Sequence, residues 1–151
     1  MGASEAARGE AGKERALFVC IHNSARSQMA EGLLRSLAGD RFEAFSAGTE
    51  ATRVRPEAVE VMAELGIDVS DQESKTLDRY IGERFDYVVT VCDEAKEACP
   101  FFPEAKKRLH WSLPDPSAAE GPEEERLAVF RSVRDRLRDM MGADLANGKG
   151  G

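Results

Sequence analysis

The stretch FVCIHNSARSQMAEG, residues 18–32, changes character halfway along its length. A continuous apolar run at 16–21 contains Cys20, mostly small or polar residues follow, and Arg26 opens a segment with helical periodicity. Such an apolar run is typical of a strand that is buried on both faces of a sheet. The sequence therefore predicts a buried strand, a short loop and a helix, with a cysteine and an arginine at the two ends of the loop.

The rest of the chain repeats this alternation of strands and helices. Further strands are predicted at 41–49, 85–92 and 106–112, and helices at 27–39, 55–66, 76–85 and 122–141. Strands that alternate with helices indicate an α/β fold with a four-stranded parallel sheet flanked by helices on both faces. We expect one domain at 16–141, between a flexible leader at 1–15 and a flexible tail at 142–151.

The overall charge and composition exclude several classes of partner. The 151 residues carry a formal net charge of -7, which argues against nucleic acid, because nucleic-acid binding needs a basic surface. No apolar run approaches the ~20 residues of a membrane span, and residues 1–15 lack the apolar core of a secretory signal. We therefore expect a cytoplasmic protein that does not enter membranes, and a monomer, because nothing indicates an obligate interface.

The loop between the first strand and the first helix has the residue types of an anion site. A strand-to-helix loop presents backbone N–H groups, and Arg26 adds a fork of donors that matches a tetrahedral oxyanion. The same groups favour the thiolate form of Cys20, and the Ser27 hydroxyl is placed to donate to its sulfur. The predicted oxyanion-binding loop consists of Ile21, His22, Asn23, Ser24, Ala25, Arg26 and Ser27. His22 either assists at the mouth of this loop or simply occupies a position in it.

Two later residues belong to the same predicted edge of the sheet. Cys92 ends the third strand, and ligands in parallel sheets bind beyond the carboxyl ends of the strands. Asp115, in WSLPDPS, lies in a stiff loop just after the fourth strand, where its carboxyl could protonate a leaving oxygen. The cysteines Cys20, Cys92 and Cys99 are odd in number, which argues against a structural disulfide framework. They are either buried small hydrophobes or the groups of a redox reaction.

With Cys20 and Arg26 at the ends of the loop and a late Asp115-Pro116, the chain resembles the low-molecular-weight protein tyrosine phosphatases. Within that fold, HNSARSQMAEG, SAGT, VTVCDEAKEACP and HWSLPDP are similar to the thioredoxin-coupled arsenate reductases. The resemblance extends over about residues 16–141. It implies an enzyme that binds arsenate, with phosphate and sulfate as competing anions, has no bound cofactor, and takes its electrons from thioredoxin. A glutaredoxin or another thiol carrier could serve instead.

The resemblance also implies a relay of thiols. Cys20 attacks arsenate held by the loop and Arg26, while Asp115 protonates the departing oxygen. Cys92 then attacks Cys20, arsenite leaves, and Cys99 attacks Cys92, so that a Cys92–Cys99 disulfide awaits reduction. Disulfide formation needs Cα atoms about 4.4–6.8 Å apart. One fixed loop cannot satisfy both pairings, so we predict that residues 92–99 rearrange during the cycle.

The residues that support the loop depart from the family pattern at one position. Family members with a potassium site hold the ion near the loop with residues that match Asn23, Glu31, Ser46 and a downstream aspartate, and the last position is Lys75 here. We expect the Lys75 ammonium to replace the ion and to orient Asn23 through Glu31, without a bound metal. The alternative is that Lys75 is simply exposed, as most lysines are.

Two other functions remain compatible with the sequence. A phosphomonoesterase would use the same loop and Asp115, with Cys92 and Cys99 protecting Cys20 from overoxidation. A non-enzymatic oxyanion sensor would bind through the loop and report through a disulfide. Only a reductase needs the Cys92 thiol for turnover, so the substitution Cys92→Ser distinguishes it from a phosphatase.

Overall fold

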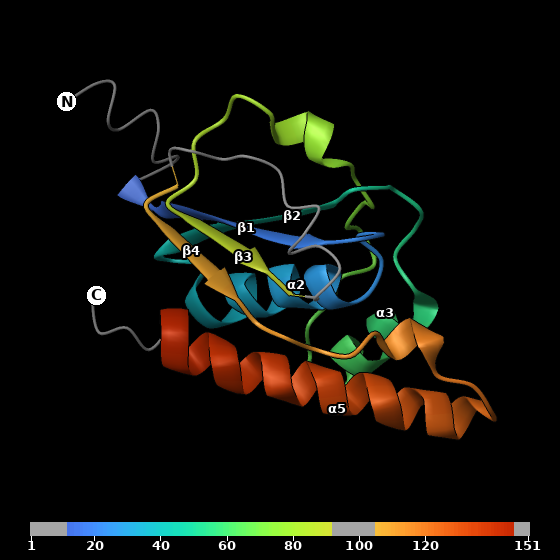
Figure 1. Cartoon of the computed structure of the whole chain (residues 1–151). Helices are drawn as coiled ribbons and strands as arrows, with labels where there is room; N and C mark the ends of the chain where they lie inside the picture. Colours follow the sequence, from blue (N-terminus) through green and yellow to red (C-terminus); the bar gives the residue numbers. More distant parts are fainter. Residues whose placement is uncertain (1–11, 92–104, 147–151) are drawn as a thin grey trace.

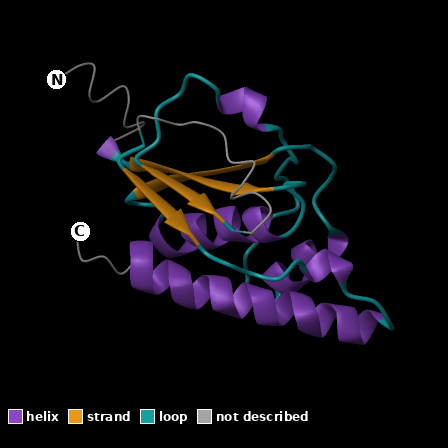
Figure 2. Ribbon diagram, viewed as in Figure 1, coloured by secondary structure: helices purple, strands orange, loops and turns teal. Residues whose placement is uncertain are grey.

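The computed structural model describes residues 12–91 and 105–146 (Figures 1 and 2). Cys92, Cys99 and the predicted rearrangement of the segment between them lie outside the described residues. The strands are β1 (Glu14–Cys20), β2 (Phe42–Gly48), β3 (Tyr87–Thr90) and β4 (Lys107–His110). All neighbouring strands are parallel and their order is β2-β1-β3-β4, which confirms the predicted four-stranded parallel sheet.

The central strand β1 is buried on both faces, as its apolar sequence predicts. Residues Ala16, Leu17, Phe18 and Val19 are fully buried, and Cys20 at the carboxyl end is 3% exposed. Its neighbours are β2 on one side and β3 on the other, with Val19 opposite Thr90. The chain therefore changes direction across the sheet at β1, and the carboxyl end of this strand lies at the switch point where α/β folds bind ligands.

Helices cover both faces of the sheet. The helices α2 (Arg26–Ala38) and α5 (Glu123–Met141) lie on one face, and α3 (Pro56–Ala63) packs against both of them (Figure 1). The opposite face carries the short 3-10 helix η2 (Leu77–Tyr80), whose Tyr80 ring packs edge-on against Phe45 and Phe85. None of the helices in the described residues is long and apolar enough to cross a membrane.

The structured region extends beyond the predicted domain limits at both ends. Strand β1 begins at Glu14, and the Arg15 guanidinium lies 4.7 Å from the ring centroids of Phe45 and Phe85. At the other end Gly142–Ala146 form a π-helix, η4, in which Leu145 is buried. Arg15 and Leu145 are isolated residues that add no periodic pattern to the sequence. The sequence analysis therefore placed both domain limits a few residues too far inward.

Two predicted helices are shorter in the structure. The segment predicted at 76–85 forms only η2, because the chain is extended at Ile81 and Gly82 has a φ of 88°, outside the helical region. The helix predicted at 55–66 ends as α3 at Ala63, and the chain turns through Gly66, whose φ of 77° is left-handed. A 3-10 helix, η3 (Pro116–Ala118), follows β4 and was not predicted.

Candidate active site

The loop after Cys20 turns its carbonyl groups outward. The carbonyl oxygens of residues 20–24 accept hydrogen bonds from Thr49 N, Glu50 N, Ser74 Oγ, Gln28 Nε2 and Arg55 N, respectively. Within the described residues, the N–H groups of residues 21–25 have no such partner. Consecutive N–H groups that face one concavity form an anion site. The loop is therefore built as a cradle for an anion.

The start of α2 adds to this cradle. Its N-cap residue, Ala25, makes no side-chain capping bond, so no side chain occupies the free N–H groups of the first helical turn. Uncapped N–H groups together with the helix dipole attract anions. Cys20 lies at the carboxyl end of β1 and Arg26 at the first position of α2, so the loop holds them at its two ends, as predicted.

Arg26 is the buried cation of the site. The residue is 4% exposed, its Nη1 donates to the carbonyl of Leu113 over 3.0 Å, and its Nη2 lies 3.7 Å from Asp115 Oδ2. Its Nε is buried and has no hydrogen-bond partner among the described residues. A buried donor without a partner costs free energy unless a ligand satisfies it. The guanidinium thus offers Nε to an anion in the loop.

Asp115 reaches the same edge of the sheet from the other side of the site. It is the N-cap of η3, and its Oδ1 accepts a hydrogen bond of 2.9 Å from Ser117 N. Its side chain is 37% exposed, so protons can be exchanged with solvent. The loop between Pro114 and Pro116 places it near Arg26, so the two residues predicted to share this edge of the sheet are brought together.

Asn23 fixes the shape of the loop from inside. It has a left-handed φ of 52° and is fully buried. Its Oδ1 accepts from Lys75 N and from Gln28 Nε2, at 2.7 and 2.8 Å. Its Nδ2 donates to Ser27 Oγ and Ser46 Oγ, at 2.8 and 3.0 Å. With all these bonds satisfied, Asn23 holds a backbone conformation that most residues avoid; the predicted bond from Ser27 to Cys20 stays a prediction.

The four predicted loop-support residues gather around one carboxylate. Glu31 Oε1 accepts from Ser46 Oγ over 2.6 Å and lies 3.8 Å from Lys75 Nζ, while its Oε2 accepts from Arg35. Lys75 is 7% exposed, and burial lowers the pKa of its ammonium although Glu31 opposes this shift. The alternative that Lys75 is exposed is therefore wrong. Its backbone N–H donates to Asn23 Oδ1, and its ammonium donates to the carbonyl of Glu73 and lies beside Glu31.

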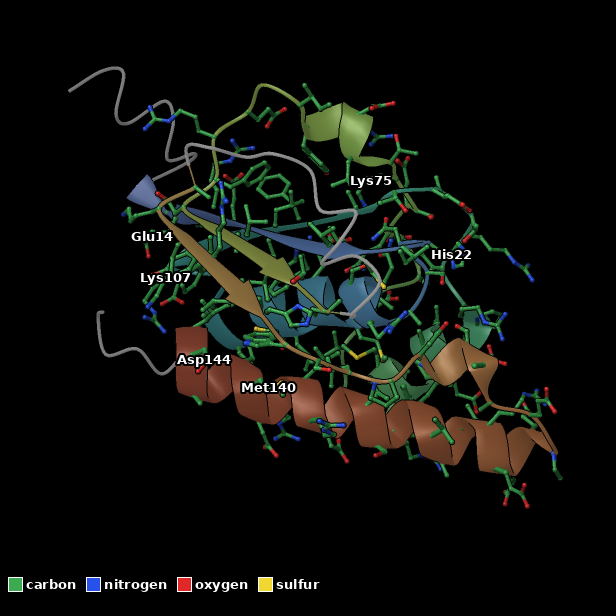
Figure 3. All side chains as sticks on the ribbon, in the orientation of Figure 1. Glu14, His22, Lys75, Lys107, Met140 and Asp144 are labelled. Atoms are coloured by element: carbon green, nitrogen blue, oxygen red, sulfur yellow. The ribbon has the colours of Figure 1, made fainter. Side chains whose placement is uncertain are left out.

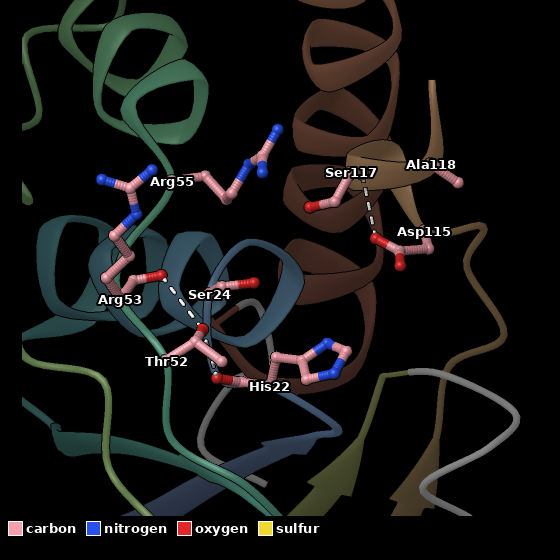
Figure 4. A pocket seen from close by; sticks show the side chains of 8 residues that line it. All are labelled: His22, Ser24, Thr52, Arg53, Arg55, Asp115, Ser117 and Ala118. Carbon is pink, nitrogen blue, oxygen red and sulfur yellow. Dashed lines mark hydrogen bonds between the residues drawn. The ribbon is translucent and has the colours of Figure 1, made fainter. Parts of the chain in front are cut away.

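A cavity of about 380 Å³ opens in front of the loop (Figure 4). Its lining residues are His22, Ser24, Thr52, Arg53, Arg55, Asp115, Ser117 and Ala118. Cys20 and Arg26 are not among them, since both are almost completely buried. His22 stands at the mouth with a half-exposed side chain, and its Nε2 lies 3.6 Å from Glu50 Oε1. Figure 3 shows His22 at this end of the molecule, where the loop also lies.

Several functional residues escaped prediction from the sequence. Gln28 is fully buried and donates to the loop carbonyl of Asn23, but within a helix it reads as an ordinary surface glutamine. Gly48 also contacts the loop, because a Cβ there would lie 2.5 Å from the carbonyl oxygen of Ile21. Only the position of Gly48 at a predicted strand end gave a signal. In the parts of the chain that the structure describes, no three His, Cys, Asp or Glu side chains gather to hold a metal.

Fold and site together define a class of protein: a parallel α/β domain whose first strand presents a cysteine beneath an anion-binding loop. The chain belongs to the low molecular weight phosphotyrosine protein phosphatase family, whose family model matches residues 15–147. The structures similar to this chain include both arsenate reductases and a low molecular weight protein tyrosine phosphatase. Membership of the family therefore establishes the fold and the class of site.

The similar proteins are described mainly as arsenate reductases. An arsenate reductase of Halalkalibacterium halodurans is 49% identical over 120 residues, which cover 80% of this chain and 86% of the relative. Two solved arsenate reductase structures, one in a phosphate-binding state and one in an oxidised state, are each 32% identical to this chain, with TM-scores of 0.73 and 0.76, and each match covers 89% of this chain and 98% of the other. A thioredoxin-dependent arsenate reductase of Corynebacterium glutamicum is 29% identical with a TM-score of 0.66, over 93% of this chain and 66% of that one.

Proposed function

We propose that this protein reduces arsenate to arsenite, with Cys20 as the nucleophile. The observation that carries the proposal is the loop itself: five consecutive carbonyls are engaged from outside, and the N–H groups of residues 21–25 are left for a tetrahedral oxyanion. Arsenate reductases that are 44–49% identical to this chain support arsenate as the oxyanion. Phosphate and sulfate are tetrahedral oxyanions of similar shape and charge, so they compete for the same loop.

The first chemical step uses only described residues. The loop N–H groups and the free Nε of Arg26 hold arsenate, and the Cys20 thiolate attacks arsenic. An S–As bond forms while an As–O bond breaks, and Asp115 delivers the proton that lets the oxygen leave as water. The 3.7 Å separation of Arg26 and Asp115 allows one oxyanion to contact both groups.

The second half of the reaction reduces arsenic. Cys92 attacks the sulfur of Cys20, the electron pair of the S–As bond passes to arsenic, and arsenic leaves as arsenite in the +3 state. Cys99 then attacks Cys92, and thioredoxin or another thiol carrier reduces the resulting Cys92–Cys99 disulfide. This relay rests on the sequence and on the similarity to a thioredoxin-dependent reductase. It needs free thiols, so we place the monomeric protein in the reducing cytoplasm.

The role of Lys75 is part of the same proposal. Its ammonium lies beside Glu31, at the position where family members with a potassium site place an aspartate beside the ion. We propose that this internal cation orients Asn23 through Glu31 and Ser46, and so keeps the loop in its anion-binding shape. No cofactor is needed for any step, because the thiols carry the electrons.

Phosphomonoester hydrolysis is the second candidate, because the family includes phosphatases and the first step would be the same. The cavity walls favour the reductase over a phosphatase for large aryl esters. Among the described residues that line the cavity, arginine, serine and threonine side chains predominate, and His22 is the only ring. Of the described lining residues only Ala118 has a wholly apolar side chain, so an aryl leaving group has no apolar ring or long aliphatic chain among them to pack against.

The decisive experiment measures arsenate-dependent oxidation of NADPH with thioredoxin and thioredoxin reductase. We expect turnover by the wild type and none by Cys20→Ser, Cys92→Ser or Cys99→Ser. Circular dichroism of each variant verifies the fold. If the wild type does not turn over arsenate but hydrolyses an aryl phosphate, and this hydrolysis survives Cys92→Ser and Cys99→Ser, the protein is a phosphatase.

A further inference from the structure

The amide of Gln28 lies behind the anion loop with its nitrogen toward the loop. The side chain is fully buried, and Nε2 donates to the carbonyl and to Oδ1 of Asn23, over 3.1 and 2.8 Å. Across a trans peptide, the carbonyl of one residue and the N–H of the next point in opposite directions. A donor that holds the Asn23 carbonyl behind the loop therefore turns the N–H of Ser24 to the front, where Ser24 lines the cavity (Figure 4).

The orientation of the Gln28 amide depends on its neighbours. A glutamine amide has a donor end and an acceptor end, and a half-turn of its terminal bond exchanges them. The described groups bonded to Nε2 are all acceptors: Asn23 O, Asn23 Oδ1 and, over 2.8 Å, Glu73 O. On the other side, Gln72 Nε2 donates to Gln28 Oε1 over 2.7 Å. Gln28 can therefore donate to the loop without leaving its own oxygen unpaired, because Gln72 supplies a donor.

A charged residue sets the orientation of Gln72 in turn. Its Oε1 accepts a hydrogen bond of 2.9 Å from Arg35 Nη1. A guanidinium has five donors and no acceptor, so Gln72 must present its oxygen to Arg35 and its nitrogen to Gln28. The hydrogen bonds from Arg35 to Gln72, to Gln28 and to Asn23 consequently run in one direction. We call these four residues the amide series.

We propose that Gln72 is a positioning residue for anion binding, which passes the donor direction set by Arg35 through Gln28 to the loop. It contacts no anion itself; it keeps the Asn23 carbonyl behind the loop and the Ser24 N–H turned to the anion. That this anion is the substrate rests on the proposed function, whereas the direction of the amide series does not. The requirement on residue 72 is thus for a donor toward Gln28, beyond its size or its contact with Arg35.

The test compares two substitutions of Gln72 that are similar in size. Gln72→Glu keeps the bond to Arg35 but sets a carboxylate oxygen against Gln28 Oε1, and a half-turn of the Gln28 amide would set Oε1 against its three acceptors instead. Gln72→Met removes the donor without adding an acceptor of comparable strength, so Gln28 can keep its bonds to the loop. We expect Gln72→Glu to weaken phosphate binding by about tenfold or more, and Gln72→Met by about threefold or less.

Binding is measured with radiolabelled inorganic phosphate in equilibrium dialysis, at constant ionic strength, with reduced cysteines and well below the Tm of each variant. Ser70→Glu is the control for added charge, because Ser70 is exposed on the same segment and its hydroxyl donates to Asp68; it should bind phosphate as the wild type does. With arsenate, Gln72→Glu should raise KM and leave kcat within about twofold. A fold defect alone would lower the number of sites and kcat, not the affinity of the sites that remain.

Four results would overturn the proposal. Wild-type phosphate affinity in Gln72→Glu excludes it, and equal weakening in Gln72→Glu and Gln72→Met shows that donor direction is irrelevant. Equal weakening in Ser70→Glu attributes the effect to added charge. If Gln72→Glu does not fold, Gln28→Met decides, because it removes the donor to Asn23 and should weaken phosphate binding by about three- to tenfold; unchanged binding there overturns the proposal. Arsenate turnover by the wild type is measured in parallel, so a failure of this proposal with turnover intact leaves the reductase proposal standing.

Discussion

Two clusters of charged groups in this molecule contain similar residues in opposite environments. The loop-support cluster, Asn23, Glu31, Ser46 and Lys75, is buried behind the loop, and the side chains of Glu31 and Lys75 are 8% and 7% exposed. The helix-surface cluster joins α3 to α5 through Glu64, Arg131 and Arg134, and Glu64 and Arg131 are 34% and 41% exposed. The shorter ion pairs are in the second cluster, where Arg131 Nη2 and Arg134 Nη1 lie 2.8 and 2.9 Å from Glu64, compared with 3.8 Å from Lys75 Nζ to Glu31.

The comparison shows that the length of an ion pair and the free-energy cost of breaking it are separate properties. Water reaches Glu64 and Arg131, so breaking the contact between them returns both charges to solvent at little cost, and the buried Arg134 keeps its bonds to Val61 O and Asp135. In the loop-support cluster no water replaces a lost partner, and the remaining charge is stranded in the protein interior. The cluster with the longer ion pair, 3.8 Å from Lys75 to Glu31, should therefore be the one on which fold and function depend.

Removal of the buried carboxylate gives the largest expected effect. Glu31→Gln removes the carboxylate beside the Lys75 ammonium, which keeps its bond to the Glu73 carbonyl. We expect the free energy of unfolding to fall by about 3 kcal/mol, at the lower end of the range for broken buried pairs. Urea denaturation measures this loss. Glu64→Gln is the control in the exposed cluster, and an equal loss in the two variants would contradict the comparison.

A methyl group behind the loop should have the next largest effect, this time on binding. A Cβ on Gly48 would lie 2.5 Å from Ile21 O and 2.8 Å from Asn23 N, so the loop backbone must move. We expect Gly48→Ala to weaken phosphate binding at least tenfold and to cost about 1–3 kcal/mol of stability. Binding is measured by equilibrium dialysis. Gly142→Ala is the control, because no atom of the described residues lies within 4 Å of a Cβ there. Unchanged binding by Gly48→Ala would show that the loop tolerates the shift.

The internal ammonium makes a smaller and more specific prediction. Lys75 already supplies a cation beside Glu31, so an added potassium ion should gain little by binding there. Potassium added at constant ionic strength should therefore change kcat/KM for arsenate by less than about twofold. Lys75→Asp removes the ammonium and restores the carboxylate of the potassium-binding relatives. We expect this variant to become dependent on potassium, relative to sodium. A severalfold activation of the wild type would mean that Lys75 does not replace the ion.

The sheet and the two ends of the loop could be predicted from the sequence, because local residue patterns indicate both. Alternating apolar runs and helical periodicity predicted the parallel strands, and the carboxyl ends of parallel strands bring distant residues to one edge. The proximity of Arg26 and Asp115 follows from that rule alone. These features need no knowledge of how any side chain points.

The residues that sequence reasoning missed act through distant partners. Gln28 donates to Glu73 O and Gln72 to Gln28, across 45 and 44 positions of the chain, and no local pattern records such pairs. The first turns of α2 bury polar side chains, Arg26, Ser27, Gln28 and Glu31, which reverses the usual rule that polar positions of a helix face solvent. Burial of polar groups at an anion site is a tertiary property, and it appears only once the loop has folded.

The smallest expected effect concerns the exposed cluster and its pH dependence. Hydrogen bonds from Arg131, then from Arg134, lower the pKa of Glu64 from its ordinary value of 4.5 to about 2. Because the folded-state pKa is depressed, the contribution of Glu64 to stability is fully present above pH 4.5 and is lost as the pH falls toward 2.

The size of this contribution should be small, for two physical reasons. Glu64 is exposed, so water and salt screen its pairing, and it caps the carboxyl end of α3, where the helix dipole disfavours a negative charge. Glu64→Gln should therefore lower Tm at pH 7 by only about 2 °C or less, and the difference from wild type should vanish near pH 2 and in 1 M salt. Glu60→Gln, one turn earlier on α3, is the matched control and should leave the pH profile of Tm unchanged. A difference in Tm that persists at pH 2 or in high salt would mean that packing of the Glu64 side chain, rather than its charge, holds α3 to α5. Differences in packing, not in the screening of charge, would then distinguish the two clusters.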